Sequence, residues 1–126
     1  MSRMRATVVV VTPDANLRTL AEQVIGAAGY RVITAPHTGH ALLACMKVGQ
    51  VDVLAAEWAM DDLSGPALAE RLRRICPDMT AVFFGDPDTR EHTGVLMRPF
   101  TGEELLAAVA TARAAAYAWQ TTTSAS

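Results

Sequence analysis

The chain has 126 residues, of which 51% are hydrophobic, so it is long enough for one domain around one core. Its 11 basic and 13 acidic residues give a net charge of −2, and no run of Lys or Arg predicts a surface for nucleic acid or an anionic membrane. From the apolar pattern we expect neither a secretory leader nor a membrane span, and Cys45 and Cys76 form no CxxC pair. We therefore expect a cytoplasmic protein whose reduced thiols pack in the core.

Short β-branched runs alternate along the chain with stretches in which apolar residues recur every three or four positions. The first pattern is typical of strands buried on both faces, and the second of amphipathic helices. The runs predict strands at residues 8–11, 31–35, 51–56, 81–84 and 95–97. Helices are predicted at residues 15–28, 39–48, 65–75 and from 102 to 117 or 119.

Residues with capping chemistry stand at several of these boundaries. Gly29 is a candidate to end the first helix, and Thr38 is the expected N-cap of the second. Thr101 is the expected N-cap of the last helix, whose first turn carries Glu103 and Glu104, in line with the helix dipole. Alternating strands and helices predict βαβ units, and therefore an α/β fold in which helices cover both faces of a parallel sheet.

The order and spacing of several short strings resemble the receiver domains of two-component signalling. The resemblance covers residues 6–117, and we expect one receiver-like domain over residues 1–120 and a disordered tail over 121–126. It implies a doubly wound, flavodoxin-like sheet of five parallel strands in the order 2-1-3-4-5. The strings are Leu17-Arg18, Ala28-Gly29-Tyr30, Asp52-Val53-Leu54, Trp58, Met60, Gly65 and Arg98-Pro99-Phe100.

The resemblance also implies a phosphorylation site at the carboxyl ends of the strands. In the family, two acidic residues hold Mg²⁺, an Asp is the nucleophile, and a hydroxyl residue and a Lys contact the phosphoryl oxygens. The chain departs from this pattern at every one of these positions. Thr12 and Pro13 replace the acidic pair, and Asp14 follows one position further along. Glu57 stands in place of the nucleophilic Asp. Gly85 replaces the hydroxyl residue, and Arg98, just before Pro99, replaces the Lys.

These substitutions argue against phosphoryl transfer. The Glu57 carboxylate is one methylene longer than that of Asp, and a misplacement of about 1 Å is costly for in-line attack. Arg98 is a cation that can fork onto a carboxylate, so we predict a contact between Glu57 and Arg98. Two interpretations of Glu57 stay open: a mimic of the phosphorylated Asp, or a polar group that only pairs with Arg98.

The segment between the last two strands is too short and too polar for a helix. Residues 86–94 contain Pro and Gly and no apolar side chain, so the fourth helix of the family is expected to be missing or reduced. Its loss predicts a partner surface on the uncovered sheet, used by another signalling protein or by a second copy in a homodimer. A re-angled last helix that covers the gap is the alternative. The predicted surface comprises Phe83, Val95, Met97 and Phe100.

Several other polar side chains have the chemistry of metal ligands or binding residues. His37 and His40 lack a third metal ligand nearby, and surface or cap positions are expected for them. Weak cation binding by Asp14, Asp61 and Asp62 is a minor alternative. No metal and no cofactor are therefore predicted. Arg71, Arg73 and Arg74 are expected on a solvated face of the third helix, whereas Tyr117 and Trp119 are expected to pack the last helix or anchor a partner.

The sequence predicts a stand-alone adaptor rather than an enzyme, which acts through protein contacts and without aspartyl phosphorylation. The alternative is a module that still accepts phosphate or a small molecule at the strand ends, near Thr12, Asp14, Glu57 and Arg98. A regulator whose output domain lies on another chain is a third possibility.

Overall fold

The computed structural model describes the backbone of residues 5–86 and 95–125 and the side chains of these residues up to Ala115. Its strands are β1 (Thr7–Val11), β2 (Arg31–Ala35), β3 (Val53–Glu57), β4 (Thr80–Gly85) and β5 (Val95–Met97). Its helices are α1 (Ala15–Ala27), α2 (Thr38–Val48), α3 (Gly65–Arg73) and α4 (Gly102–Ala125). The predicted alternation of strands and helices is confirmed, with β3 displaced towards Glu57.

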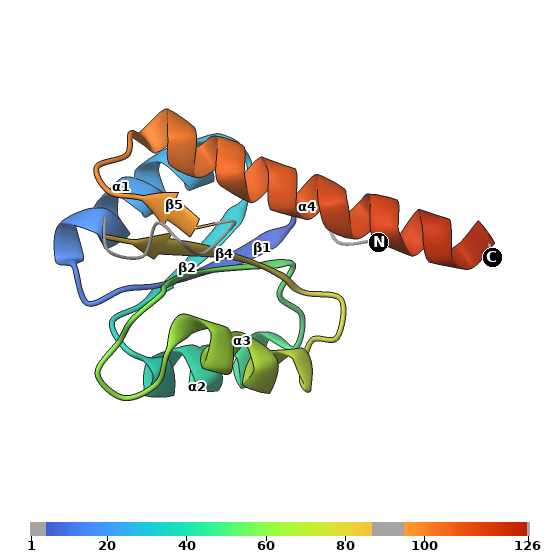
Figure 1. The fold of residues 1–126 in the computed structure, drawn as a ribbon, viewed down its shortest axis with the longest axis horizontal. Helices are drawn as coiled ribbons and strands as arrows, with labels where there is room; N and C mark the ends of the chain where they lie inside the picture. Colours follow the sequence, from blue (N-terminus) through green and yellow to red (C-terminus); the bar gives the residue numbers. More distant parts are fainter. Residues whose placement is uncertain (1–4, 87–94, 126) are drawn as a thin grey trace.

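The strands form one parallel sheet in the order β2-β1-β3-β4-β5, as predicted. Helices α1 and α4 cover one face of this sheet, and α2 and α3 cover the other (Figure 1). Because every strand runs in the same direction, all five carboxyl ends lie at one edge of the sheet. The loops after β1, β2 and β3 therefore meet at that edge.

Two apolar cores hold these layers together. Successive residues of a strand point to opposite faces, so β1 supplies Val8 and Val10 to the core under α1 and α4. Val9 and Val11 enter the core under α2 and α3. All four valines are fully buried. A strand buried on both faces needs such a continuous apolar run, which explains why this pattern identified it.

The helix caps agree only in part with those predicted from the sequence. Gly29 follows the C-cap of α1 with a φ of 102°, a left-handed conformation that favours glycine. Thr101 and Glu104 form a reciprocal capping box at the start of α4. The prediction for α2 was wrong, because its N-cap is His37, whose Nδ1 accepts from the His40 amide at 3.3 Å. Thr38 instead donates its hydroxyl to Asp62.

Helix α4 is longer than predicted. It continues past the expected end at Tyr117 or Trp119 to Ala125 and so includes residues that the sequence analysis placed in a tail. Alanine is the strongest helix former, and it recurs in this helix from Ala107 to Ala118, whereas residues 120–124 contain none. The helix extends well beyond the sheet that it covers (Figure 1). Across the described residues, no helix is both long and apolar enough to cross a bilayer.

The expected absence of a helix between β4 and β5 concerns residues 87–94, which lie outside the described residues. The described part of the chain contains the four helices given above. Val95 and Met97, on β5, point to the face of the sheet that α2 and α3 cover.

Both cysteines lie in the core under α2 and α3, as expected. Burial raises the pKa of the Cys45 thiol to about 11, and the neighbouring Cys76 adds to this shift. A thiol with so high a pKa is almost entirely protonated at neutral pH and therefore unreactive. Cys45 is thus a packing residue in the folded chain.

At the amino edge of the sheet, one residue joins three strands. The Asp52 carboxylate accepts from the Thr7 amide at 2.8 Å, and the Asp52 amide donates to the Thr7 carbonyl at 2.9 Å. Its own carbonyl accepts from the Thr80 amide at 3.1 Å. Asp52 therefore links the starts of β1 and β4 across β3.

Candidate functional site

The loops at the carboxyl edge bring together the residues that the sequence singled out. Glu57 is the last residue of β3, and Thr12 directly follows β1. The Thr12 amide donates to the Ala35 carbonyl at 3.1 Å, which fixes the start of this loop against β2. The Arg98 amide donates to the Gly85 carbonyl at 2.8 Å and so places Arg98 beside the end of β4.

Glu57 and Arg98 form a two-point ion pair, which confirms the predicted contact. Arg98 Nη1 donates to Glu57 Oε1 at 2.9 Å, and Nη2 donates to Oε2. The Thr12 hydroxyl also donates to Oε2, at 2.7 Å. Glu57 is only 8% exposed, so these bonds replace water around a buried carboxylate. The hydrogen bonds that Arg98 donates to Glu57 also raise the pKa of Arg98 above its ordinary value.

The residues around this pair do not fit a Mg²⁺ site. The Thr12 hydroxyl donates to Glu57 and also accepts from the Asp14 amide at 3.1 Å. Pro13 has no side-chain oxygen. The Asp14 carboxylate caps α1 by accepting from the Asn16 amide at 2.9 Å. A hard cation prefers several oxygen ligands, whereas Thr12 and Glu57 are held in hydrogen bonds within the protein and Asp14 uses one of its two oxygens as the helix cap.

Two of the three predicted site residues from the end of β4 onwards, Gly85 and Pro99, offer no polar side-chain group. Gly85 pairs with Met97 in the β4–β5 ladder and has no hydroxyl to offer. Pro99 is exposed after a cis peptide bond with Arg98. Arg98 is therefore the only one of these three residues with a side chain that reaches Glu57.

The structure places three of the four predicted partner-surface residues on one face of the sheet. Phe83 pairs with Val95, and Gly85 pairs with Met97, so Phe83, Val95 and Met97 project to the same side. All three are half-buried. Phe100 lies in the opposite layer, where its ring is 5.7 Å from that of Phe84. Phe100 is thus separated from the other three.

Sequence reasoning missed the role of Trp58 on this face. The ring of Trp58 meets that of Phe83 edge-on, with 5.5 Å between the centroids. The Trp58 amide donates to the Phe84 carbonyl at 2.8 Å, which continues the pairing of β3 with β4 by one residue. An aromatic residue one position after a buried strand was the available signal. Trp58 is half-buried beside the three residues named above.

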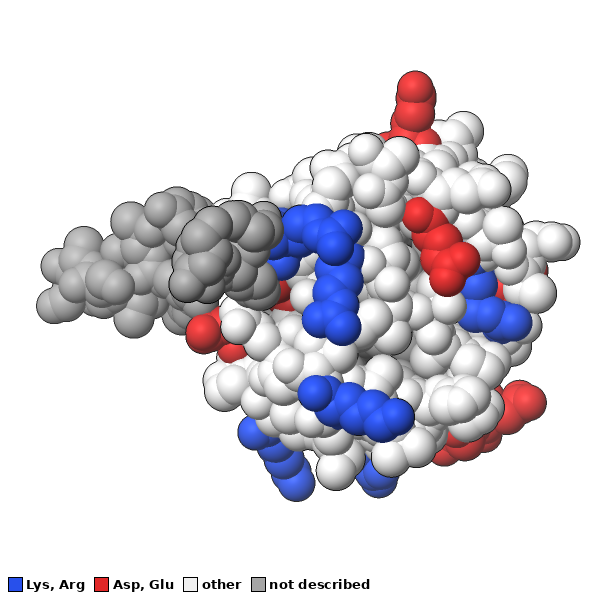
Figure 2. Space-filling model, turned by 180° about the vertical axis from the view of Figure 1, so that it is seen from behind, with Lys and Arg blue, Asp and Glu red and all other residues white. Residues whose placement is uncertain are grey.

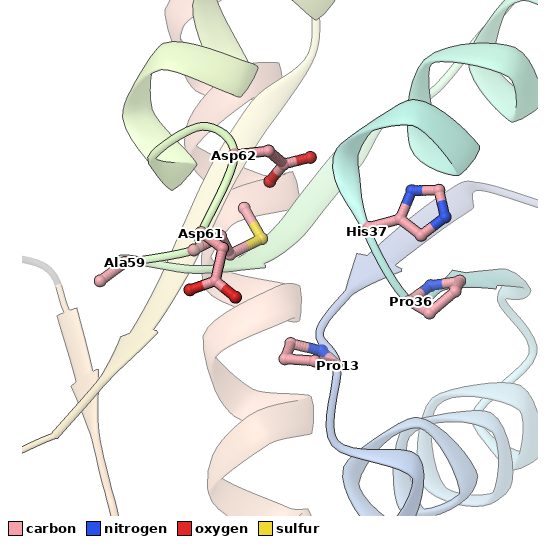
Figure 3. A pocket seen from close by; sticks show the side chains of 7 residues that line it. Pro13, Pro36, His37, Ala59, Asp61 and Asp62 are labelled. Atoms are coloured by element: carbon pink, nitrogen blue, oxygen red, sulfur yellow. The ribbon is translucent and has the colours of Figure 1, made fainter.

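A cavity of about 200 Å³ opens among the same loops. Figure 3 shows Asp61 and Asp62 on the loop after β3, across the opening from Pro13, Pro36 and His37. The hydrogen bond from Thr38 holds the pKa of Asp62 below its ordinary value, so this carboxylate is charged at neutral pH. The cavity therefore combines rigid apolar walls with an anionic side.

His37 and His40 stack on each other and do not form a metal centre with the described acidic residues near them. Their ring centroids are 4.8 Å apart and nearly parallel. Throughout residues 5–86 and 95–125, no three His, Cys, Asp or Glu side chains are grouped to hold a metal ion. His37 serves as the helix cap described above.

Comparisons with known proteins identify the fold. No family model and no curated protein matches the chain. The response regulator receiver protein of Sinorhizobium medicae has a TM-score of 0.78 at 20% identity, with 91% of this chain and 99% of that chain covered. For the Vibrio cholerae chemotaxis protein CheY4 the TM-score is 0.74 at 22% identity, with 86% and 99% covered.

A longer protein also contains this fold. NtrX from Brucella abortus matches with a TM-score of 0.83 at 18% identity, over 98% of this chain but only 30% of that chain. These likenesses show that the chain has the receiver-domain fold. Because the sequence identities are only 18–22%, the likenesses concern the fold and not the chemistry of the residues at the strand ends.

Proposed function

We propose that this chain is a signalling module of the receiver family that works by protein contact and without aspartyl phosphorylation. One observation carries the proposal. The carboxylate at the phosphoacceptor position, Glu57, has both oxygens bound by Arg98 and one also by Thr12. Attack on phosphorus needs an accessible oxygen, whereas both oxygens of Glu57 accept hydrogen bonds and the residue is only 8% exposed.

The surrounding charges support the same proposal. Phosphoryl transfer requires cations and donors that are free to receive the incoming oxygens. The guanidinium of Arg98 already faces Glu57 and lies 3.6 Å from Asp86. Gly85 and Pro13 supply neither a hydroxyl nor a metal ligand. Both interpretations of Glu57, as a phosphoryl mimic or as an ion-pair residue, involve the same Arg98 contact.

The alternative, a small-molecule site at the strand ends, has less support. The cavity beside Pro13 and Asp61 has a volume of about 200 Å³, and a second cavity, beside Asp14 and Arg98, has about 310 Å³. Pockets for small molecules usually measure roughly 300–1,000 Å³, so the first is below this range and the second only reaches its lower end. A loop or single side chain of a partner fits a cavity of this size better than a free metabolite.

Treatment with acetyl phosphate, or with beryllofluoride, in the presence of Mg²⁺ tests the loss of phosphorylation. We expect no phosphoryl adduct by intact-protein mass spectrometry and no change in tryptophan fluorescence with beryllofluoride. A phosphorylatable receiver domain in the same reaction is the positive control. A stoichiometric adduct on Glu57 would show that the site still accepts phosphate.

The partner surface can be tested by adding a charge to it. A Met97→Lys variant is expected to lose most partner recovery in a pull-down from the native lysate, because the lysine disrupts an apolar contact. Met46→Lys is the matched control, since Met46 is 63% exposed on α2, which packs on β1 and β2, at the other side of the sheet from β5. Equal recovery with Met97→Lys and the unmodified chain would place the partner elsewhere.

A further inference from the structure

The fold sorts the charges of the chain, although the net charge is close to zero. The sequence contains no basic run, but the structure gathers dispersed cations at the amino edge of the sheet. We call this surface the basic end. It comprises Arg5, Arg31, Lys47, Arg73, Arg74 and Arg113. The exposed Asp78, between α3 and β4, is an acidic residue at the same edge, so the cations there outnumber the exposed acids without excluding them.

The topology explains how these residues meet. Arg31 opens β2, while Lys47 and Arg73 lie in the last turns of α2 and α3. In a βαβ unit, each helix runs back to the edge where the strands begin. Arg113 reaches the same edge, because the Thr80 hydroxyl at the start of β4 donates to the carbonyl of its neighbour Ala112 at 3.1 Å.

The opposite edge has the opposite charge. We call it the acidic end, and its exposed carboxylates are Asp14, Asp61, Asp62, Asp86, Glu103 and Glu104. Two described arginines lie there and are engaged internally: Arg98 with Glu57, and Arg18 with the Thr12 carbonyl at 2.7 Å. In Figure 2, most Lys and Arg side chains lie on the left and lower part of the surface, where some acidic side chains are also seen, and the other Asp and Glu side chains lie on the right and top.

We infer that copies of this chain associate head to tail, with the basic end of one copy against the acidic end of the next. Charge complementarity selects this occupant, because a second copy complements both ends at once. The cavity at the acidic end adds a specific receptor. Its Pro13 and Pro36 walls suit the methylene stem of a Lys or Arg, and Asp61 and Asp62 suit its charge.

The geometry of this contact has consequences for size and salt dependence. A head-to-tail contact is heterologous, so each added copy leaves one basic and one acidic end open, and association continues unless a ring closes. The contacts are exposed ion pairs, which are individually weak and are screened by salt. Association should therefore be seen at low ionic strength and high protein concentration. This inference does not depend on whether Glu57 accepts phosphate.

Sedimentation velocity on charge-reversed chains tests the inference. The unmodified chain is expected to form higher species at low salt, which revert to monomer at high salt. A basic-end variant, Lys47→Glu with Arg74→Glu, and an acidic-end variant, Asp61→Lys with Glu103→Lys, should each be monomeric at low salt. An equimolar mixture of the two variants should associate again, because each then faces a complementary end.

A control separates this contact from nonspecific attraction. Glu22→Lys with Glu70→Lys changes the net charge as the acidic-end variant does, but on the exposed sides of α1 and α3. It should self-associate like the unmodified chain. Circular dichroism melting confirms that each variant is folded. A monomeric unmodified chain at low salt, or a mixture that stays monomeric, would overturn the inference. Retention of that monomer on a polyanion column would instead assign the basic end to an anionic polymer.

Discussion

Replacing Arg98 with methionine is expected to lower the free energy of unfolding by about 2–3 kcal/mol. The substitution keeps an unbranched apolar stem but leaves the buried Glu57 carboxylate without its cation. Removing one partner of a buried pair typically costs about 3–5 kcal/mol, and the lower value here reflects the 28% exposure of the Arg98 side chain. Urea unfolding, followed by circular dichroism, measures the loss.

Two further variants show whether the unpaired carboxylate is the cause. Asp86→Ala removes the second, more distant carboxylate, which is 69% exposed, and should change stability by less than about 0.5 kcal/mol. The double variant Glu57→Met with Arg98→Met removes both charges and should regain at least half of the lost stability. A double variant less stable than Arg98→Met would show that the charge of Glu57 is not the destabilising element.

Replacing Gly65 with alanine is expected to cost about 3 kcal/mol, although it adds a single methyl group. A Cβ at this position would lie 2.3 Å from the Glu57 carbonyl oxygen and 2.9 Å from Phe83 Cδ1. The carbonyl belongs to a central strand and cannot move without disturbing the sheet. Overpacking a rigid site costs about 1–3 kcal/mol, and a clash with backbone falls at the upper end.

The same substitution in α1 provides the matched comparison. At Gly26 a Cβ would meet only Val32 Cγ2, at 4.0 Å, in ordinary contact. Since alanine favours the helix over glycine, Gly26→Ala should gain about 0.5–1 kcal/mol. Thermal and urea unfolding of the two variants should therefore give opposite signs. Equal, small effects would show that the loop before α3 relaxes around the new methyl group.

Much of the fold followed from the sequence, because the signals were local. The valine run of β1 and the three- and four-residue spacing of α1 each depend on neighbours along the chain, and both elements formed where expected. The predicted cap of α2 did not form, because the Thr38 hydroxyl donates a hydrogen bond to Asp62, which is 24 positions away in the sequence. Tertiary contacts of this kind override local capping preference.

The candidate site was predictable where a substitution had one obvious chemical consequence. An arginine in place of the family's lysine, beside a carboxylate, predicted the Glu57–Arg98 pair. The additional bond from Thr12 was not predicted, because it depends on the rotamer that a buried hydroxyl adopts. The basic end was not predicted either, since its residues are dispersed along the chain and meet only through the topology.

The bonds of Asp52 give the two edges of the sheet different mechanical roles. Through hydrogen bonds to Thr7, on β1, and Thr80, on β4, this residue ties the amino edge together, and amide hydrogens there should exchange with solvent slowly. At the carboxyl edge, the loops after the strands carry the candidate site. The amino edge thus holds the sheet together independently of the loops that carry Pro13, Glu57 and Gly85, so these loops can change while the sheet beneath them is kept.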